Sequence, residues 1–263
     1  MLLKFLRSRR AAVAAPVAHM PQDVRAYAIG DIHGRLDLLD QLIDAIDADD
    51  ACRPPAQTHL VFLGDLIDRG PQSAEVIDRV IEIENARPNV SIIAGNHEEV
   101  FLLALEGDRE ALRFFSRIGG RETILSYGIA AEIYDQIDYD GLAALLAKHV
   151  PAAHIDFLRS LKNTVILGDY LFVHAGIRPG VALEDQKLSD LRWIRRAFLD
   201  FEGYNGFVVV HGHTPSAAVE YRHNRVGIDT GAWETGRLTA LGLQGTDRWQ
   251  IDTAVPMRRA VGL

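Results

Sequence analysis

Cysteine is nearly absent from this sequence, which has a single one, Cys52, among its 263 residues. A lone cysteine cannot form an internal disulfide, so we expect a reducing compartment and place the protein in the cytoplasm. A metal site built from several thiolates is also excluded, so any metal must be held by nitrogen and oxygen. A thiol phosphatase is disfavoured because the nucleophile elbow and arginine loop that it requires are missing.

Long apolar runs and an excess of positive charge are missing as well. No stretch approaches the ~18 residues needed to cross a bilayer, so we expect no stable membrane insertion. The net charge of −8 argues against a nucleic-acid partner, because such proteins spread basic surface along the phosphate backbone. The one basic cluster, MLLKFLRSRR, is interpreted as part of a flexible tail over residues 1–22.

The remainder, residues 23–263, has the length and hydrophobic content of one large domain. At the start of this domain, short continuous apolar segments alternate with segments whose apolar residues have helical spacing. Strands are expected at 26–30, 59–63 and 90–94, and helices at 36–46 and 74–83. This order predicts right-handed crossovers and parallel pairing. Residues from about 98 to 162 are expected to form a helical cap inserted beside the sheet.

Strand patterns return after the cap, at 164–167, 170–174 and 207–211, with a helix near 189–199. Later runs at 225–228, 238–243 and 248–251 are interpreted as antiparallel strands joined by turns that contain glycine. We therefore predict an α/β sandwich in which a second, mostly antiparallel sheet packs on the first and helices lie outside.

Polar residues cluster where five of the predicted strands end. The segments are GDIHG (30–34), GDLIDRG (64–70), GNHE (95–98), VHAG (173–176) and VHGHT (210–214). Loops of an open α/β sheet converge at the carboxyl ends of its strands, so these side chains should meet. Burying so many aspartates and histidines is costly unless they have partners, and metal ions are such partners. Carboxylates with imidazoles suit manganese, iron or zinc better than calcium or magnesium alone.

The ordered motifs GDIHG, GDLIDRGPQS, GNHEE, VHAG and HGHTP resemble those of the calcineurin-like metallophosphoesterases. More narrowly, they resemble the phosphoprotein phosphatase branch in its bacterial form. The resemblance covers residues 25–245 and implies a four-layer sandwich of two mixed β-sheets with helices outside, plus the cap. It also implies two divalent metal ions, with Mn²⁺ favoured and Fe or Zn as alternatives.

The same resemblance assigns the metal ligands. Asp31 and His33 would hold the first metal, Asp65 would bridge, and the second would be held by Asn96, His174 and His213. Related families with a GHxH motif have a further metal-binding histidine two residues after the first, where this sequence has Pro215. His211 and Asp229 stay open: each either supports a metal ligand or is an ordinary residue at a strand end.

Four more residues receive roles from the resemblance. His97 would be the general acid that protonates the leaving oxygen, and Asp68 would hold its imidazole in the useful tautomer. Arg69 would bind phosphate oxygens through its planar guanidinium, and Arg195 would be the second phosphate-binding arginine. The neighbouring Arg192 and Arg196 are then surface charges.

The function that these motifs favour is hydrolysis of phosphomonoesters in proteins by attack of metal-bound hydroxide. Phosphoserine and phosphothreonine come first, with phosphotyrosine as a further substrate. A diadenosine tetraphosphate hydrolase is the alternative, because it shares the fold and the first three motifs. It would need an aromatic clamp in the cap, for which the candidates are Phe101, Phe114, Phe115, Tyr127 and Tyr134. A catalytically silent phosphate-binding scaffold is disfavoured, since it would be expected to have lost a metal ligand or His97.

Overall fold

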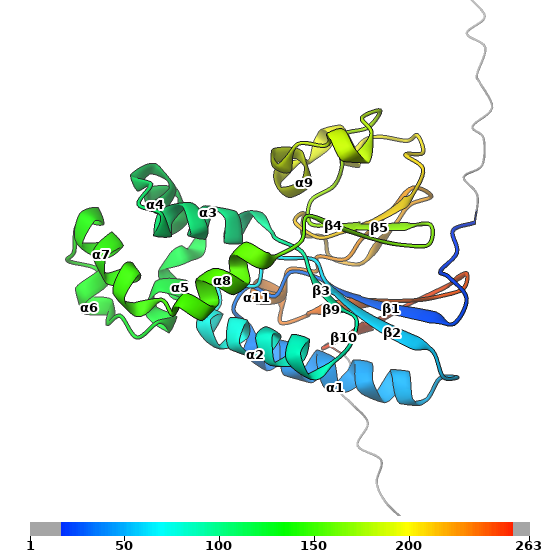
Figure 1. Ribbon diagram of the computed structural model, residues 1–263, viewed down its shortest axis with the longest axis horizontal. Helices are drawn as coiled ribbons and strands as arrows, with labels where there is room; N and C mark the ends of the chain where they lie inside the picture. Colours follow the sequence, from blue (N-terminus) through cyan, green and yellow to red (C-terminus); the bar gives the residue numbers. More distant parts are fainter. Residues whose placement is uncertain (1–16, 255–263) are drawn as a thin grey trace, which may run out of the picture.

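The computed structural model describes residues 17–254, and its two sheets face each other between layers of helices (Figure 1). The first sheet has the order β10-β9-β1-β2-β3. Its strands are β1 (Val24–Ile29), β2 (Gln57–Phe62), β3 (Val90–Ile92), β9 (Thr239–Gln244) and β10 (Asp247–Asp252). The first three run parallel, as predicted, and β9 and β10 add to the β1 edge in antiparallel fashion.

The second sheet has the order β4-β5-β6-β8-β7. Its strands are β4 (Thr164–Leu167), β5 (Tyr170–Val173), β6 (Val208–His211), β7 (Glu220–Tyr221) and β8 (Arg225–Gly227). Strands β5, β6 and β8 are parallel to one another, whereas β4 and β7 are antiparallel at the two edges. The expectation of a mostly antiparallel second sheet is therefore wrong: this sheet is mixed, and two of the late strands belong to the first sheet.

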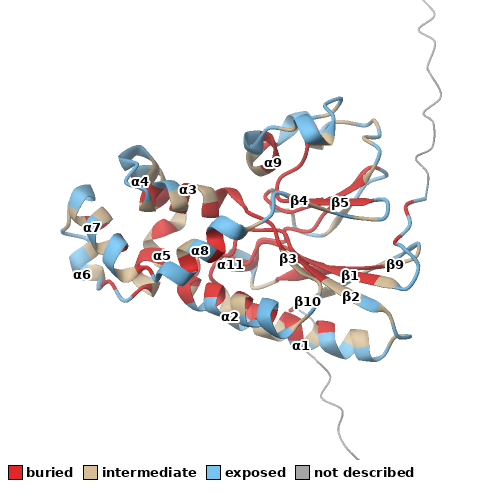
Figure 2. Ribbon diagram, in the orientation of Figure 1, coloured by how far each residue is buried: buried red, intermediate tan, exposed pale blue. Residues whose placement is uncertain are grey.

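Side chains that alternate along the strands create the layers. In β1, Ala26 and Ala28 face the second sheet, while Tyr27 and Ile29 face the helices. In β5, Phe172 lies between the sheets, and Leu171 packs on the outer helices. Figure 2 shows the resulting buried interior along both sheets. This arrangement confirms the predicted α/β sandwich with two mixed sheets.

Helices α1 (Leu36–Ala51) and α2 (Ser73–Ala86) cover the outer face of the first sheet (Figure 1). The outer face of the second sheet carries a 3₁₀ turn, η2 (Leu183–Asp185), and the short helices α9 (Leu188–Trp193) and α10 (Arg196–Leu199). Sequence periodicity predicts one helix over 189–199, but the chain leaves helical geometry at Ile194 (ψ 141°) and Arg195 (φ −130°, ψ −105°).

The cap consists of consecutive helices that project from one side of the sandwich (Figure 1). They are α3 (Asn96–Leu105), α4 (Arg109–Phe115), a π-helical turn η1 (Ser116–Gly120), α5 (Arg121–Ser126), α6 (Ala131–Tyr134), α7 (Tyr139–His149) and α8 (Ala152–Ser160). Their apolar side chains continue the core that underlies α1 and α2. The cap is therefore packed on the sandwich by a continuous hydrophobic core.

The predicted tail is only partly described. Residues 1–16, with the basic cluster, lie outside the described residues, and so do residues 255–263. Residues 17–22 dock on the sandwich: Ala18 and Met20 are buried, and the Met20 amide donates to the Gly245 carbonyl at 2.8 Å. None of the described helices combines the length and the apolar character that a bilayer crossing requires.

A small helix completes the fold near the strand ends. Helix α11 (Ala232–Thr235) follows β8 and lies where the cap meets the sheets (Figure 1). Gly231 and Gly236 flank it with φ of 68° and 72°, the left-handed region that glycine adopts without steric cost.

Candidate active site

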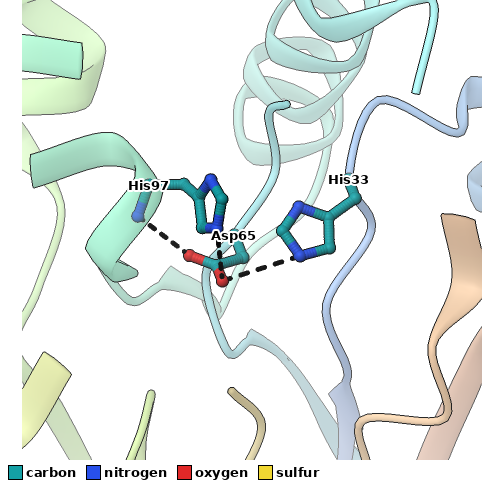
Figure 3. A group of neighbouring side chains, drawn as sticks. All are labelled: His33, Asp65 and His97. Carbon is teal, nitrogen blue, oxygen red and sulfur yellow. Dashed lines mark hydrogen bonds and ion pairs between the residues drawn. The ribbon is translucent and has the colours of Figure 1, made fainter. Parts of the chain in front are cut away.

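The carboxylate of Asp65, in the loop after β2, lies at the centre of the buried polar cluster. Its Oδ2 atom is 3.7 Å from His33 Nε2, 3.8 Å from His97 Nε2 and 3.4 Å from His174 Nε2. Figure 3 shows His33 and His97 on either side of this carboxylate. Asp65 therefore has the shared position that a bridging ligand requires.

The remaining predicted ligands surround Asp65. Asn96 Oδ1 lies 3.0 Å from His174 Nε2, and Asp31 accepts hydrogen bonds from the His213 amide at 3.0 and 3.2 Å. All six predicted ligands are buried. Within residues 17–254, side-chain geometry alone finds two groups that could hold an ion: His33, Asp65 and His97, and Asp65, His174 and His213. Asp31 stands outside both groups, and His97, assigned by the resemblance as the acid, stands inside the first.

The orientation of two histidines suits metal binding. His33 Nδ1 is 2.8 Å from the Ile67 carbonyl, and His174 Nδ1 is 2.8 Å from the Leu63 carbonyl. A neutral imidazole that donates from Nδ1 to a backbone carbonyl keeps its Nε2 lone pair for a ligand, and here both Nε2 atoms face Asp65. Burial lowers the pKa of His33 to about 3 and that of His213 to about 3, so both are neutral near pH 7.

The carboxylates of the cluster are crowded with like charge. Burial and the neighbouring Asp229 hold the pKa of Asp31 well above its usual range. Burial would raise the pKa of Asp65 too, but His174, His97 and His33 outweigh it and hold that pKa well below normal. Burial opposes a charged His174, yet Asp65 and Asp31 raise its pKa to about 10. Divalent cations would relieve the repulsion between these acids, so the donor set fits metal ions.

His97 forms a short pair with Asp68. The distance from His97 Nδ1 to Asp68 Oδ2 is 2.6 Å, and both side chains are almost fully buried. Burial lowers the pKa of His97, but Asp65 and the hydrogen bond to Asp68 outweigh it and raise that pKa above normal. The contact is the one the predicted dyad requires, and the acid role stays a prediction.

The two predicted phosphate-binding arginines both reach the cluster. Arg69 places Nη1 3.0 Å from His33 Nε2 and Nη2 3.1 Å from His97 Nε2. Arg195 donates from Nε to His213 Nε2 at 3.2 Å. Arg192 is not a free surface charge, because it is partly buried and pairs with Glu99 at 3.0 Å. Arg69 therefore contacts the group of His33, Asp65 and His97, and Arg195 contacts the group of Asp65, His174 and His213.

The two residues whose roles the sequence leaves open, His211 and Asp229, have different surroundings. The printed contacts of His211 are with other groups than the predicted ligands: its Nδ1 lies 3.1 Å from the Gly212 carbonyl and its Nε2 lies 3.5 Å from Arg225 Nη1. Asp229 accepts from the Gly231 amide at 2.9 Å and lies close enough to Asp31 to raise its pKa. Asp229 therefore acts on a predicted ligand through its charge, whereas His211 has the contacts of an ordinary strand-end histidine.

The backbone at this site adopts an unusual conformation. Positive φ angles occur at His33 (49°), Asp65 (50°), Asp68 (73°), Arg69 (69°) and His213 (64°). Residues other than glycine rarely adopt this region, and held in it they cost of order 1–3 kcal/mol each. Among the described residues, only Asp23 and Asn89 share this property without belonging to the predicted site. Strain is thus concentrated in the loops that carry the chemistry.

Comparison with known proteins agrees with this geometry. A family model for calcineurin-like phosphoesterases matches residues 24–238, most of the chain. The chain belongs to the calcineurin-like phosphoesterase family. This membership confirms the family resemblance of the motifs and makes the protein a phosphoester hydrolase of a metal-dependent family. It also agrees with the paired metal-binding groups around Asp65.

Curated relatives in this family carry a narrower name. Bis(5'-nucleosyl)-tetraphosphatase PrpE [asymmetrical] of Anoxybacillus flavithermus is 28% identical over 87% of this chain and 94% of its own. The protein of the same name from Bacillus thuringiensis is 26% identical with the same coverage. These names do not confirm the predicted preference for phosphoproteins.

Solved structures share the phosphoesterase fold. A candidate diadenosine tetraphosphatase has a TM-score of 0.60 at 18% identity, over 89% of this chain and 98% of that one. A cold-active protein tyrosine phosphatase has a TM-score of 0.53 at 18% identity, over 89% and 82%. At such low identity these neighbours establish the fold alone.

Two buried residues that support the site are missing from the sequence prediction. Glu98 accepts hydrogen bonds from the amides of Gly95 (2.8 Å), Asp65 (3.0 Å) and Leu66 (2.8 Å), and so ties the second and third motifs together. Thr123, in cap helix α5, donates to Asp68 Oδ1 at 2.6 Å and accepts from the Asp68 amide at 2.9 Å. The position of Glu98 in the motif GNHEE could have identified it as a site residue, whereas no motif in the sequence marks Thr123 as one.

Most of the aromatic residues considered for a clamp belong to the core. Phe101, Phe115 and Tyr127 are buried, and Phe101 stacks on both of the other rings, with centroid distances of 4.9 Å to Phe115 and 6.1 Å to Tyr127. Phe114 is partly buried and lies 5.9 Å from Trp193, which itself donates to Glu99 at 2.6 Å. Tyr134 is partly buried against the same core, with the Arg121 guanidinium carbon 5.5 Å from its ring centroid. The five candidates therefore do not form an exposed clamp.

Proposed function

We propose that the protein is a metal-dependent hydrolase of dinucleoside tetraphosphates that cleaves one phosphoanhydride bond of the polyphosphate bridge. The observation that carries this proposal is the extent of the similarity to PrpE-named relatives, which covers 87% of this chain and 94% of theirs. The similarity therefore extends over most of both chains. It favours the dinucleotide over the phosphoprotein that the motifs alone placed first.

The residues proposed to hold two divalent ions are Asp31, His33 and Asp65 on one side and Asp65, Asn96, His174 and His213 on the other. Mn²⁺ is the ion that we propose, with Fe and Zn as alternatives, because the donors are carboxylate, amide and imidazole. When bound, such ions supply an activated water and neutralise charge on the phosphates.

The chain's own groups act on the substrate around that centre. Arg69 and Arg195 would bind phosphoryl oxygens, since each guanidinium has donors directed into the cluster. His97 would protonate the departing oxygen, and Asp68, 2.6 Å from its Nδ1, would orient the ring so that Nε2 faces the reacting group.

A phosphoprotein phosphatase is the second candidate, and the His97–Asp68 pair is the observation that favours it. A serine or threonine alkoxide is strongly basic and leaves poorly unless it is protonated, so a buried, well-oriented acid is most useful for an ester. The phosphate leaving group of an anhydride is much less basic. The dyad alone therefore favours esters, while the extent of the similarity favours the dinucleotide.

The test compares both substrates on one metal-loaded preparation. With Mn²⁺, we expect kcat/KM for diadenosine tetraphosphate to exceed that for phosphoserine and phosphotyrosine peptides, with unequal nucleotide products resolved by anion-exchange chromatography. An Asp65→Asn variant controls for contaminating hydrolases. The reverse order of kcat/KM would make the protein a phosphoprotein phosphatase, and turnover of neither substrate by protein with verified metal would support the silent scaffold.

A further inference from the structure

An exposed tryptophan borders the phosphate-binding arginine. Trp233, in helix α11, is 42% exposed, and the guanidinium carbon of Arg69 lies 5.6 Å from its ring centroid. Arg69 in turn contacts His33 and His97 at 3.0 and 3.1 Å. Of the exposed aromatic residues in the described part of the chain, Trp233 is the one whose ring contacts a residue of the site.

Helix α11 holds this ring in a defined position. Ala232 is 1% exposed and packs in the main core, and its carbonyl accepts from Arg35 Nη1 at 3.2 Å. Thr235 Oγ1 lies 2.9 Å from both the Thr230 and Gly231 carbonyls, and these hydrogen bonds connect the end of the helix to the residues just before it. A single turn anchored at both ends thus presents its large apolar side chain outward, beside the site.

We propose that Trp233 is a stacking platform for a nucleobase of the substrate. Aromatic stacking tolerates any base because every base has a π-face, and the ring lies next to the arginine that would bind the phosphates of the same nucleotide. Scattered exposed aromatics need no explanation, but one fixed beside a phosphate-binding group has the arrangement of a nucleotide subsite. This inference rests on the proposed function, because it assigns a binding surface to one half of the dinucleotide.

The test measures recognition of the base separately from hydrolysis. Calorimetric titration of the Mn²⁺-loaded protein with AMP and with ribose 5-phosphate isolates the base, since the two ligands share the phosphate and the sugar. We expect the wild type to bind AMP about tenfold more tightly than ribose 5-phosphate. Trp233→Ala should abolish this ratio, and Trp233→Phe should retain part of it. Tyr221→Ala, which removes another exposed aromatic on β7, should leave it unchanged.

Kinetics then separate the two proposals. With diadenosine tetraphosphate, Trp233→Ala should raise KM by a similar factor with little change in kcat, while turnover of phosphoserine stays unchanged. If the wild type prefers AMP through Trp233 but does not cleave dinucleoside tetraphosphates, the proposed function fails and the platform stands. An unchanged AMP ratio in Trp233→Ala would overturn the platform. Equal weakening of AMP and ribose 5-phosphate would overturn it as well, because Trp233 would then only position Arg69.

Discussion

Removing the imidazole of His97 should damage catalysis in proportion to the basicity of the leaving group. The side chain is 2% exposed and its Nδ1 is 2.6 Å from Asp68, so the ring is held in place, and Asp65 with Asp68 raises its pKa above normal. Positioned acids of this kind contribute about 10²–10⁴ in rate, or ~2.7–5.4 kcal/mol of barrier. His97→Asn should therefore cost that factor in kcat on an alkyl phosphoester such as a phosphoserine peptide.

The loss should be distinctly smaller on p-nitrophenyl phosphate and on diadenosine tetraphosphate. Nitrophenolate and a nucleotide phosphate are weak bases, and they need little help from a proton to depart. Asp68→Asn should reproduce the same order of losses in milder form, because the imidazole remains but is no longer oriented. The assay is steady-state kcat on the three substrates for wild type and both variants.

Metal content must be measured in each preparation, because side-chain geometry also groups His97 with His33 and Asp65 as donors to an ion. Retained metal with unequal losses would support the acid role. Equal losses on all three substrates, or a loss accounted for by missing metal, would refute it and make His97 a ligand or a structural residue.

Three further predictions concern the bridging carboxylate, the cap and an ion pair at the edge of the second sheet. Asp65→Asn should lower metal content and kcat more than His33→Asn, because Asp65 Oδ2 lies within 3.8 Å of three histidines. Elemental analysis and steady-state kinetics measure the two effects, and equal losses in both variants would contradict a bridging role for Asp65. Thr123→Val should destabilise the fold by about 1–3 kcal/mol, because Asp68 loses buried hydrogen bonds, whereas Thr123→Ser should retain most of the stability in urea unfolding. The Arg225 hydrogen bond lowers the pKa of Glu220 from 4.5 to about 2, so its stabilisation is present above pH 4.5 and is lost as pH falls towards 2. Glu220→Gln should therefore destabilise more at pH 7 than at pH 3, and an equal effect at both would show that the carboxylate charge is not involved.

The sequence could predict which residues lie at strand ends, because hydrophobic periodicity locates strands and glycines mark the turns after them. Pairing is a different matter. The apolar runs that form β9 and β10 indicate antiparallel strands, but such a pattern does not specify which strand lies beside them. The edge of the first sheet at β1 was open to them, and Ala240 and Leu241, next to each other in β9, face opposite sides of that sheet.

The sequence alone could not predict the positive φ angles of the residues other than glycine in these loops. Glycine was expected to provide the tight turns at each motif, and Gly34 and Gly64 do have positive φ. Asp65 and Asp68 also adopt positive φ, although local preference disfavours it for residues other than glycine. Glu98, Thr123 and Ser73 hold these loops through side-chain hydrogen bonds to the backbone amides of Asp65 and Asp68. Such support is tertiary, so no local pattern indicates it.

The cap takes part in building the catalytic loop. The Arg69 amide donates to the Gly119 carbonyl at 2.9 Å, and a Cβ at Gly119 would lie 2.6 Å from Arg69 Cγ. Gly119 has φ of 117° and lies at a kink between two helices, in a backbone region that glycine tolerates better than other residues. Four residues later, Thr123 bonds to Asp68. One cap segment contacts both Asp68, the partner of the predicted acid, and Arg69, the predicted phosphate-binding arginine. If these two roles hold, we expect a shift of the cap to change proton donation and phosphate binding together.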